Sequence, residues 1–197
     1  MSLYFKKALL PFLYLIFMMV LSYTVYAVDD SLIWLRIVFS IAVFLLYGLI
    51  VCGISYKDGQ QALKTRLSND VERRYIIETG EDRPLKTNEE YKFYKGFIHG
   101  LIACIPLMIL MIIHTILIPS SDGISTGAGI VAGALYSIVF SFFSVINVQL
   151  TVYTYYYTLL AIPVIACFTG IPYILGAKSV ESQQREIKEK HKQIYGE

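Results

Sequence analysis

Five apolar runs, each about 20 residues or longer and so long enough to span a bilayer, constrain this chain more than any other feature. They cover residues 8–27, 32–55, 96–118, 127–150 and 152–176. None contains Asp, Glu or Lys, and only the second contains an Arg. A charge at the centre of a membrane helix costs roughly 2.5–3.5 kcal/mol, so the pattern fits lipid as the solvent. Barrel strands alternate over about ten residues, and these runs do not.

The runs predict an all-α protein, a polytopic transmembrane helix bundle that forms a single membrane domain over residues 1–197. We expect about five spanning helices, with a charged cytoplasmic helical loop at 56–95 and a helical C-terminal tail at 177–197. The first run ends in Val25-Tyr26-Ala27, like a signal-peptide cleavage site. Because its apolar core exceeds the usual 7–15 residues of a signal peptide, a retained first helix is the favoured interpretation.

The basic residues predict an orientation in the plasma membrane. Lys6 and Lys7 precede the first run, and the 56–95 loop carries nine Lys or Arg. Basic residues concentrate in cytoplasmic segments, so the N-terminus and the loop are expected in the cytoplasm. Five full crossings would put the basic tail outside, against the same rule. The alternative is four full crossings plus one partial crossing.

The polar segments also carry helix signals. Residues 59–79 are expected to form a helix that stops at Gly80. Thr87 and Glu90 have capping-box spacing, which predicts a helix start that continues into the third run. The tail is expected to continue the fifth run as a charged helix.

Small residues recur at helical spacing and predict close helix contacts, because small side chains let membrane helices approach one another. The fourth run has one such ridge and the third a shorter one. Their members are Ser125, just before the fourth run, with Gly129, Gly133, Ser137 and Ser141 inside it, and Gly96 and Gly100 in the third.

Polar side chains within the runs are the candidates for a solute pocket. Asn147, Gln149, Tyr153 and Tyr157 lie around the junction of the fourth and fifth runs, and His99 and His114 lie in the third run. The plainer interpretation is a Tyr collar and interfacial histidines at headgroup depth. The histidines are fifteen residues apart, about 22 Å along a helix, so they cannot ligate one haem iron.

The sequence offers no recognisable catalytic chemistry. It contains no phosphate-binding loop, no zinc-protease motif and no nucleophile elbow. The three cysteines are widely spaced, which argues against a disulfide framework or a zinc site. We therefore expect no cofactor and no metal ion, and we favour a non-catalytic protein over an enzyme. No nucleic-acid-binding module is present, so the expected partners are the lipid bilayer and a membrane protein or a second copy of the chain.

Two segments carry a family resemblance. Residues 91–106, YKFYKGFIHGLIACIP, and residues 170–178, GIPYILGAK, resemble segments of uncharacterised small multi-pass membrane proteins of clostridia-like Gram-positive bacteria. The resemblance implies a bacterial plasma membrane and carries no activity.

Two functional hypotheses remain open. The first is a non-catalytic scaffold or accessory subunit of a membrane complex, with the charged loop and tail available for docking. The alternative is a small transporter, or a transporter's membrane subunit, with the solute pocket near Asn147 and Gln149.

Overall fold

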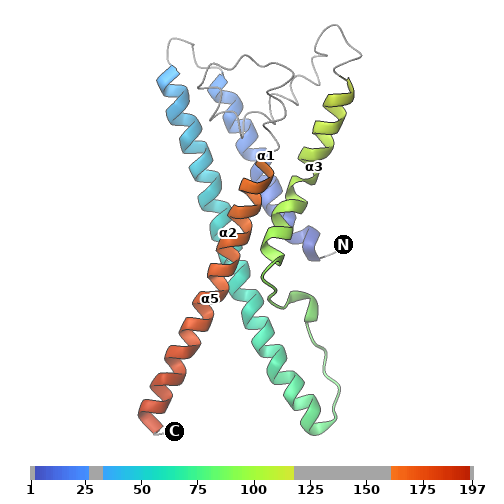
Figure 1. Ribbon diagram of the computed structural model, residues 1–197, viewed down its shortest axis with the longest axis vertical. Coiled ribbons are helices and arrows are strands. Elements are labelled where there is room, and N and C mark those ends of the chain that lie inside the picture. Colours follow the sequence, from blue (N-terminus) through green and yellow to red (C-terminus); the bar gives the residue numbers. More distant parts are fainter. Residues whose placement is uncertain (1–2, 27–32, 118–160, 196–197) are drawn as a thin grey trace.

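The computed structural model describes residues 3–26, 33–117 and 161–195. All regular elements among them are helical (Figure 1). They are α1 (Leu3–Tyr26), α2 (Ile33–Thr79), the short 3-10 helix η2 (Thr87–Glu89), α3 (Lys95–Leu117) and α5 (Ala161–Tyr195). The all-α prediction is therefore confirmed for these residues. The fourth run and the start of the fifth lie outside them, so the count of five spanning helices stays a prediction.

Two of the helices are much longer than one membrane crossing. Helix α2 has 47 residues, about 70 Å at 1.5 Å per residue, and joins the second apolar run to the charged segment without a break. Helix α5 has 35 residues and continues into the charged tail, as the sequence predicted. The sequence suggested a separate helix from Gly59. The structure instead keeps Gly59 inside α2, because this glycine serves a helix contact described below.

The predicted end of α2 at Gly80 is confirmed. Gly80 has a φ of 73°, a left-handed conformation that a glycine adopts without steric cost. Its N–H donates to the carbonyl of Ile76 at 2.9 Å, which satisfies one of the last carbonyls of the helix.

The predicted capping box at Thr87 and Glu90 is wrong. Thr87 begins η2, which has no side-chain cap, and Glu90 is extended with φ −61° and ψ 148°. Helix α3 starts only at Lys95. The Glu90 carboxylate accepts hydrogen bonds from Asn69 and Arg73 of α2, so a contact with another helix replaces the local cap.

The contacts between helices fix their directions. Phe44 of α2 packs near Phe168 of α5. Further along both helices, the Gln60 side chain donates a hydrogen bond to the Ser179 hydroxyl at 3.0 Å. Helices α2 and α5 therefore run parallel. By the same kind of contact α1 runs antiparallel to α2, and α3 runs antiparallel to α5. For the first, Lys7 pairs with Asp58 while Leu15 shares a buried cluster with Tyr47. For the second, Gly96 lies against Tyr173 and Gly100 against Thr169.

Helices α2 and α5 cross at two glycines that act reciprocally. A Cβ atom added at Gly59 would overlap the carbonyl oxygen of Tyr173, and one added at Gly176 would overlap the carbonyl oxygen of Tyr56. Each backbone thus lies against a glycine of the other helix. Below this point the helices diverge, which gives the X in Figure 1. We call this contact the crossing.

The reciprocal contact follows an internal repeat. Residues 53–59 read GISYKDG and residues 170–176 read GIPYILG, so the pattern Gly-Ile-x-Tyr-x-x-Gly recurs after 117 residues. The same register pairs Leu63 with Val180, and both are buried in one cluster beyond the crossing. Equivalent residues that meet each other in this way indicate a pseudo-two-fold relation between α2 and α5.

The preceding helices share a shorter motif at a different offset, 95 residues instead of 117. Ala8-x-x-Pro11 of α1 matches Ala103-x-x-Pro106 of α3, and both alanines are buried. The described chain thus comprises two helical units: unit 1 is α1 with α2, and unit 2 is α3 with α5. In each unit a proline-containing apolar helix precedes a longer helix that ends in a charged extension. We call these extensions the α2 leg (residues 60–79) and the α5 leg (residues 177–195).

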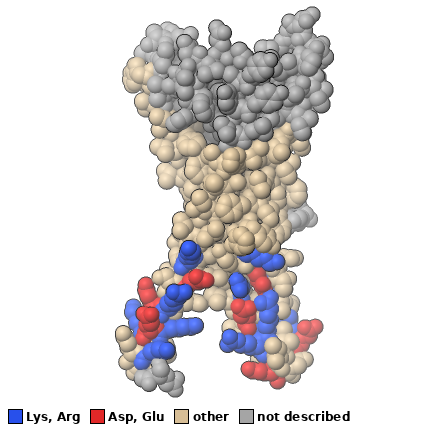
Figure 2. Space-filling model, viewed as in Figure 1, with Lys and Arg blue, Asp and Glu red and all other residues tan. Residues whose placement is uncertain are grey.

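Charge and apolar surface are separated along the molecule. In the face shown in Figure 2, the coloured charged side chains lie on the two legs and just above them, next to the crossing. Towards the other end many large apolar side chains are exposed, including Leu45 (56%) and Leu49 (72%) of α2. By length and composition two helical stretches, Ile41–Thr79 and Ile162–Tyr195, could cross a membrane. The molecule therefore has the character of a membrane-associated protein.

Candidate functional site

Four ionisable side chains from three helices meet beside the crossing, on its charged side. They are Lys7 of α1, Asp58 of α2, and Lys95 and His99 of α3, and we call them the junction cluster. Lys95 and His99 are buried, with 4% and 7% of their surface exposed. Buried ionisable groups are costly unless they are paired, so their partners indicate what the cluster does.

Lys7 and Asp58 form an ion pair between α1 and α2. Lys7 Nζ donates to Asp58 Oδ1 at 3.2 Å, and about a quarter of each side chain is exposed. The equivalent positions in unit 2 are Ile102 and Leu175, which are apolar. The ion pair is therefore a feature of unit 1 and not part of the repeated framework.

The Lys95 side chain binds the backbone of the segment that precedes α3. Its ammonium group donates to the carbonyl oxygens of Asn88 at 2.8 Å and Glu90 at 2.6 Å. These two bonds satisfy a buried charge and hold η2 against the base of the helix.

His99 lies between two aromatic rings. Its ring centroid is 5.8 Å from that of Tyr4 and 6.3 Å from that of Tyr173, with an edge-on orientation towards Tyr173. Tyr91 stacks on Tyr173 at 5.5 Å. A cavity of about 10 Å³ lies among Tyr4, Lys95 and His99. That is room for about one water molecule, so this place holds no larger solute.

The junction cluster connects helices and shows no arrangement for catalysis. Its two lysines are engaged in an ion pair and in bonds to the backbone, and no nucleophile is held against a base. Within residues 3–26, 33–117 and 161–195, no three His, Cys, Asp or Glu side chains gather where they could hold a metal ion.

The predicted helix-packing residues of α3 lie against α5. A Cβ at Gly96 would press on Tyr173 and Gly170, and one at Gly100 would overlap the hydroxyl oxygen of Thr169. His99 lies one residue from Gly100, in the junction cluster, and His114 lies on α3. The other predicted members fall outside the described residues: Ser125, Gly129, Gly133, Ser137, Ser141, Asn147, Gln149, Tyr153 and Tyr157.

The sequence interpretation missed the partners of His99 and the crossing glycines. The sequence interpretation uses Lys7, and the nine basic residues of the 56–95 loop that include Lys95, only as charges that set orientation, and it takes Gly59 as the start of a helix. An alignment of the chain with itself at a shift of 117 residues would have revealed the repeat and marked Gly59 and Gly176 as equivalent.

The comparisons with known proteins identify no relative. No protein-family model, no curated protein and no solved structure matches this chain. The functional conclusion therefore depends on the geometry of the described helices.

Proposed function

We propose that α1, α2, α3 and α5 each cross the plasma membrane once and that all their charged ends are cytoplasmic. The parallel course of α2 and α5 supports this topology, because parallel helices carry their charged legs to the same side. The ion pair between Lys7 and Asp58 brings the start of α1 to that side as well. Nine basic residues in the 56–95 loop and five in the tail then obey the positive-inside rule.

This topology removes the difficulty that five full crossings create for the basic tail. It corresponds to the alternative of four full crossings plus one partial crossing, with the end of α3 and the start of α5 both on the outer side. Reporter fusions test this topology. A reporter enzyme that works only outside the cytoplasm should be active when fused at Asp122 and inactive when fused at the C-terminus. A reporter that works only in the cytoplasm should show the reverse. A C-terminal reporter active outside would contradict the proposal.

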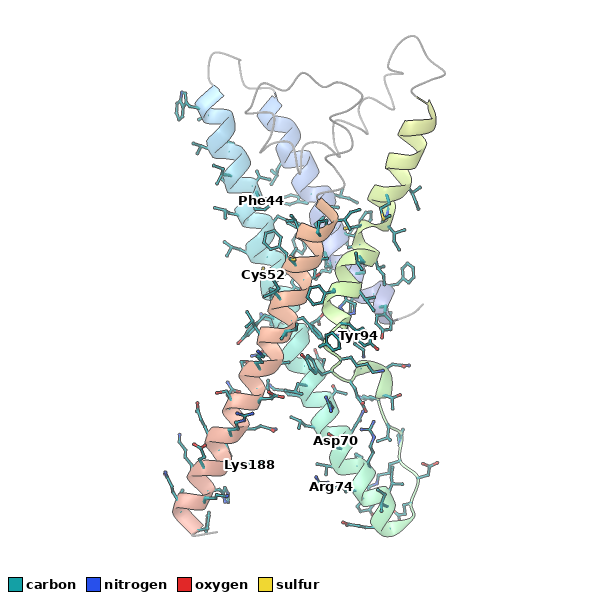
Figure 3. All side chains as sticks on the ribbon, viewed as in Figure 1. Phe44, Cys52, Asp70, Arg74, Tyr94 and Lys188 are labelled. Carbon is teal, nitrogen blue, oxygen red and sulfur yellow. The ribbon has the colours of Figure 1, made fainter. Side chains whose placement is uncertain are left out.

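The function we propose is that of a non-catalytic accessory or scaffold subunit, which presents two rigid charged legs to a cytoplasmic partner. The observation that carries it is the tight crossing from which both legs diverge. Backbones in contact at Gly59 and Gly176 leave no passage between α2 and α5 at that point, whereas the legs are long and exposed. Figure 3 shows Asp70 and Arg74 on the α2 leg and Lys188 on the α5 leg.

Native electrophoresis of membranes solubilised in mild detergent tests this function. Arg74→Glu combined with Lys188→Glu reverses one charge on each leg, and Arg74→Lys with Lys188→Arg is the matched control. The wild type and the control should migrate in a complex larger than the 22.4 kDa chain, and the charge-reversed variant should not. Migration of all three as the free chain, or an intact complex after charge reversal, would refute the proposal.

A small transporter is the second candidate, and the internal repeat is the observation that favours it. Parallel repeats related by an axis along the membrane normal are common in transporters. Swelling assays on vesicles containing the purified protein, with sugars, polyols and amino acids as solutes, distinguish the two. Solute entry would favour the transporter, and impermeable vesicles the accessory subunit.

A further inference from the structure

A cavity of about 320 Å³ lies on the α2 leg, separate from the crossing and the junction cluster. One wall is a single face of α2, formed by Thr65, Ser68, Asn69 and Glu72 at helical spacing. The opposite wall is the returning chain at residues 83–86, which we call the return segment. The volume lies within the range of about 300–1,000 Å³ typical of small-molecule sites.

Two partly buried hydrogen bonds join the α2 face to the chain that returns along it. The Lys86 backbone N–H donates to Asn69 Oδ1 at 3.3 Å, and Asn69 Nδ2 donates to Glu90 Oε1 at 2.7 Å. Asn69 is only 5% exposed. Because a buried amide with both ends bonded resists displacement, the return segment is fixed against the leg.

The Arg83 guanidinium is set in place at the rim. It lies 3.7 Å from the centre of the Tyr75 ring, and Nη1 donates to Glu72 Oε2 at 3.0 Å. The hydrogen bond to Glu72 raises the pKa of Arg83, so this group stays charged. A guanidinium has five N–H donors, and the bond to Glu72 uses one of them.

We infer that this cavity binds the phosphate group of a small hydroxyl-bearing phosphate ester. Arg83 and Lys86 supply two positive charges, and Thr65 and Ser68 supply hydroxyl donors. A phosphate monoester carries about −1.5 to −2 charges at neutral pH and three acceptor oxygens, which matches this set better than a single carboxylate does. The Glu72 carboxylate, already fixed by Arg83, can accept a hydrogen bond from an ester hydroxyl.

The position of the cavity favours a soluble ester over a lipid headgroup. Thr65 lies seven residues beyond Asp58, which corresponds to about 10 Å along the helix, and Glu72 lies about 21 Å beyond it. If the junction cluster lies at headgroup depth, the cavity faces the aqueous side. At the equivalent positions of the α5 leg, Ser68 and Asn69 are replaced by Arg185 and Glu186, so the site belongs to unit 1 alone.

Titration calorimetry on the full-length protein in detergent tests the inference. The soluble probes are glycerol 3-phosphate, inorganic phosphate and glycerol, and the lipid probe is phosphatidylcholine vesicles with and without phosphatidic acid. Glycerol 3-phosphate should bind and glycerol should not. Lys86→Gln should weaken binding at least about tenfold, since it removes one charge-assisted contact. Arg74→Gln, which removes an exposed charge outside the cavity, should leave it unchanged.

Three results would overturn the inference. If none of the phosphate-bearing probes binds, the site is refuted. Equal weakening by Lys86→Gln and Arg74→Gln would reduce it to general charge attraction. Binding to phosphatidic acid vesicles without competition from glycerol 3-phosphate would assign the phosphate to a lipid and refute the soluble ester.

Discussion

The two units share their packing residues and differ in their polar ones. Both place Gly-Ile-x-Tyr-x-x-Gly at the crossing and bury an aliphatic residue, Leu63 or Val180, one turn beyond it. Among the described residues, only unit 1 carries an ion pair at these positions, Lys7–Asp58, and only its leg lies against the return segment. In unit 2 the corresponding ion-pair positions are apolar, and the leg ends in exposed Ile194 and Tyr195.

The residues that both units share therefore form the fold, and the residues found in only one unit give that unit its own features. Residues kept in both units make contacts that either unit needs in order to cross its partner. Residues found in one unit have no such common role, and in unit 1 they form the junction cluster and the leg cavity. We therefore expect substitutions at repeated positions to affect both units alike, and substitutions at unrepeated positions to affect one.

The crossing glycines should give the largest effects. Gly59→Ala and Gly176→Ala each force a methyl group into a backbone carbonyl and should lower the free energy of unfolding by about 3 kcal/mol. Denaturant unfolding in detergent measures this. Gly53→Ala is the control, because a Cβ there meets nothing within 4 Å. If Gly59→Ala is as stable as Gly53→Ala, the close crossing does not exist.

The aliphatic pair beyond the crossing comes next. Leu63→Ala and Val180→Ala remove methyl groups from the same buried cluster, so each should cost about 2 kcal/mol. The same unfolding measurement applies. A large loss of unfolding free energy for one variant and none for the other would show that the legs are not equivalent at Leu63 and Val180.

The ion pair of unit 1 should show a smaller, non-additive effect. Lys7→Ile or Asp58→Leu alone leaves a partly buried charge without its partner and should cost about 1 kcal/mol. The double variant, which copies the apolar residues of unit 2, should be more stable than either single one. A double-mutant cycle measures the coupling, and strictly additive losses would argue against a direct Lys7–Asp58 interaction.

The exposed leg isoleucines should matter least for stability. Ile77 is 82% exposed and Ile194 is 72% exposed, at equivalent positions of the two legs. Ile77→Ala and Ile194→Ala should each change the free energy of unfolding by less than about 0.5 kcal/mol. A loss above about 1.5 kcal/mol in thermal or denaturant unfolding is larger than an exposed surface substitution normally causes, and it would show that a leg packs against another part of the protein.

Local signals in the sequence predicted the features that depend on neighbouring residues. The length of the apolar runs predicted the helical class. Gly80 predicted the end of α2, because a glycine adopts the left-handed conformation without help from distant residues. The continuous fifth helix and tail agree with the absence of proline between residues 173 and 195, although Gly176 lies within that stretch.

Features that depend on distant residues were misread or missed. Gly59 resembles a helix boundary until Tyr173 is seen against it. Glu90 fits a capping box, but the amide of Asn69 and the guanidinium of Arg73 satisfy its carboxylate. Of the predicted solute pocket only His99 has described side-chain contacts, and they are with tyrosines of α1 and α5.

The central claim is that two repeated units cross in parallel and deliver both legs to one face of a membrane. Thiol labelling from each side tests it most directly, with Ile77→Cys and Ile194→Cys introduced singly after replacement of Cys52, Cys104 and Cys167 by Ala. An impermeant maleimide should label both positions in inside-out vesicles and neither in intact cells. Labelling of either position from outside the cell would contradict the account.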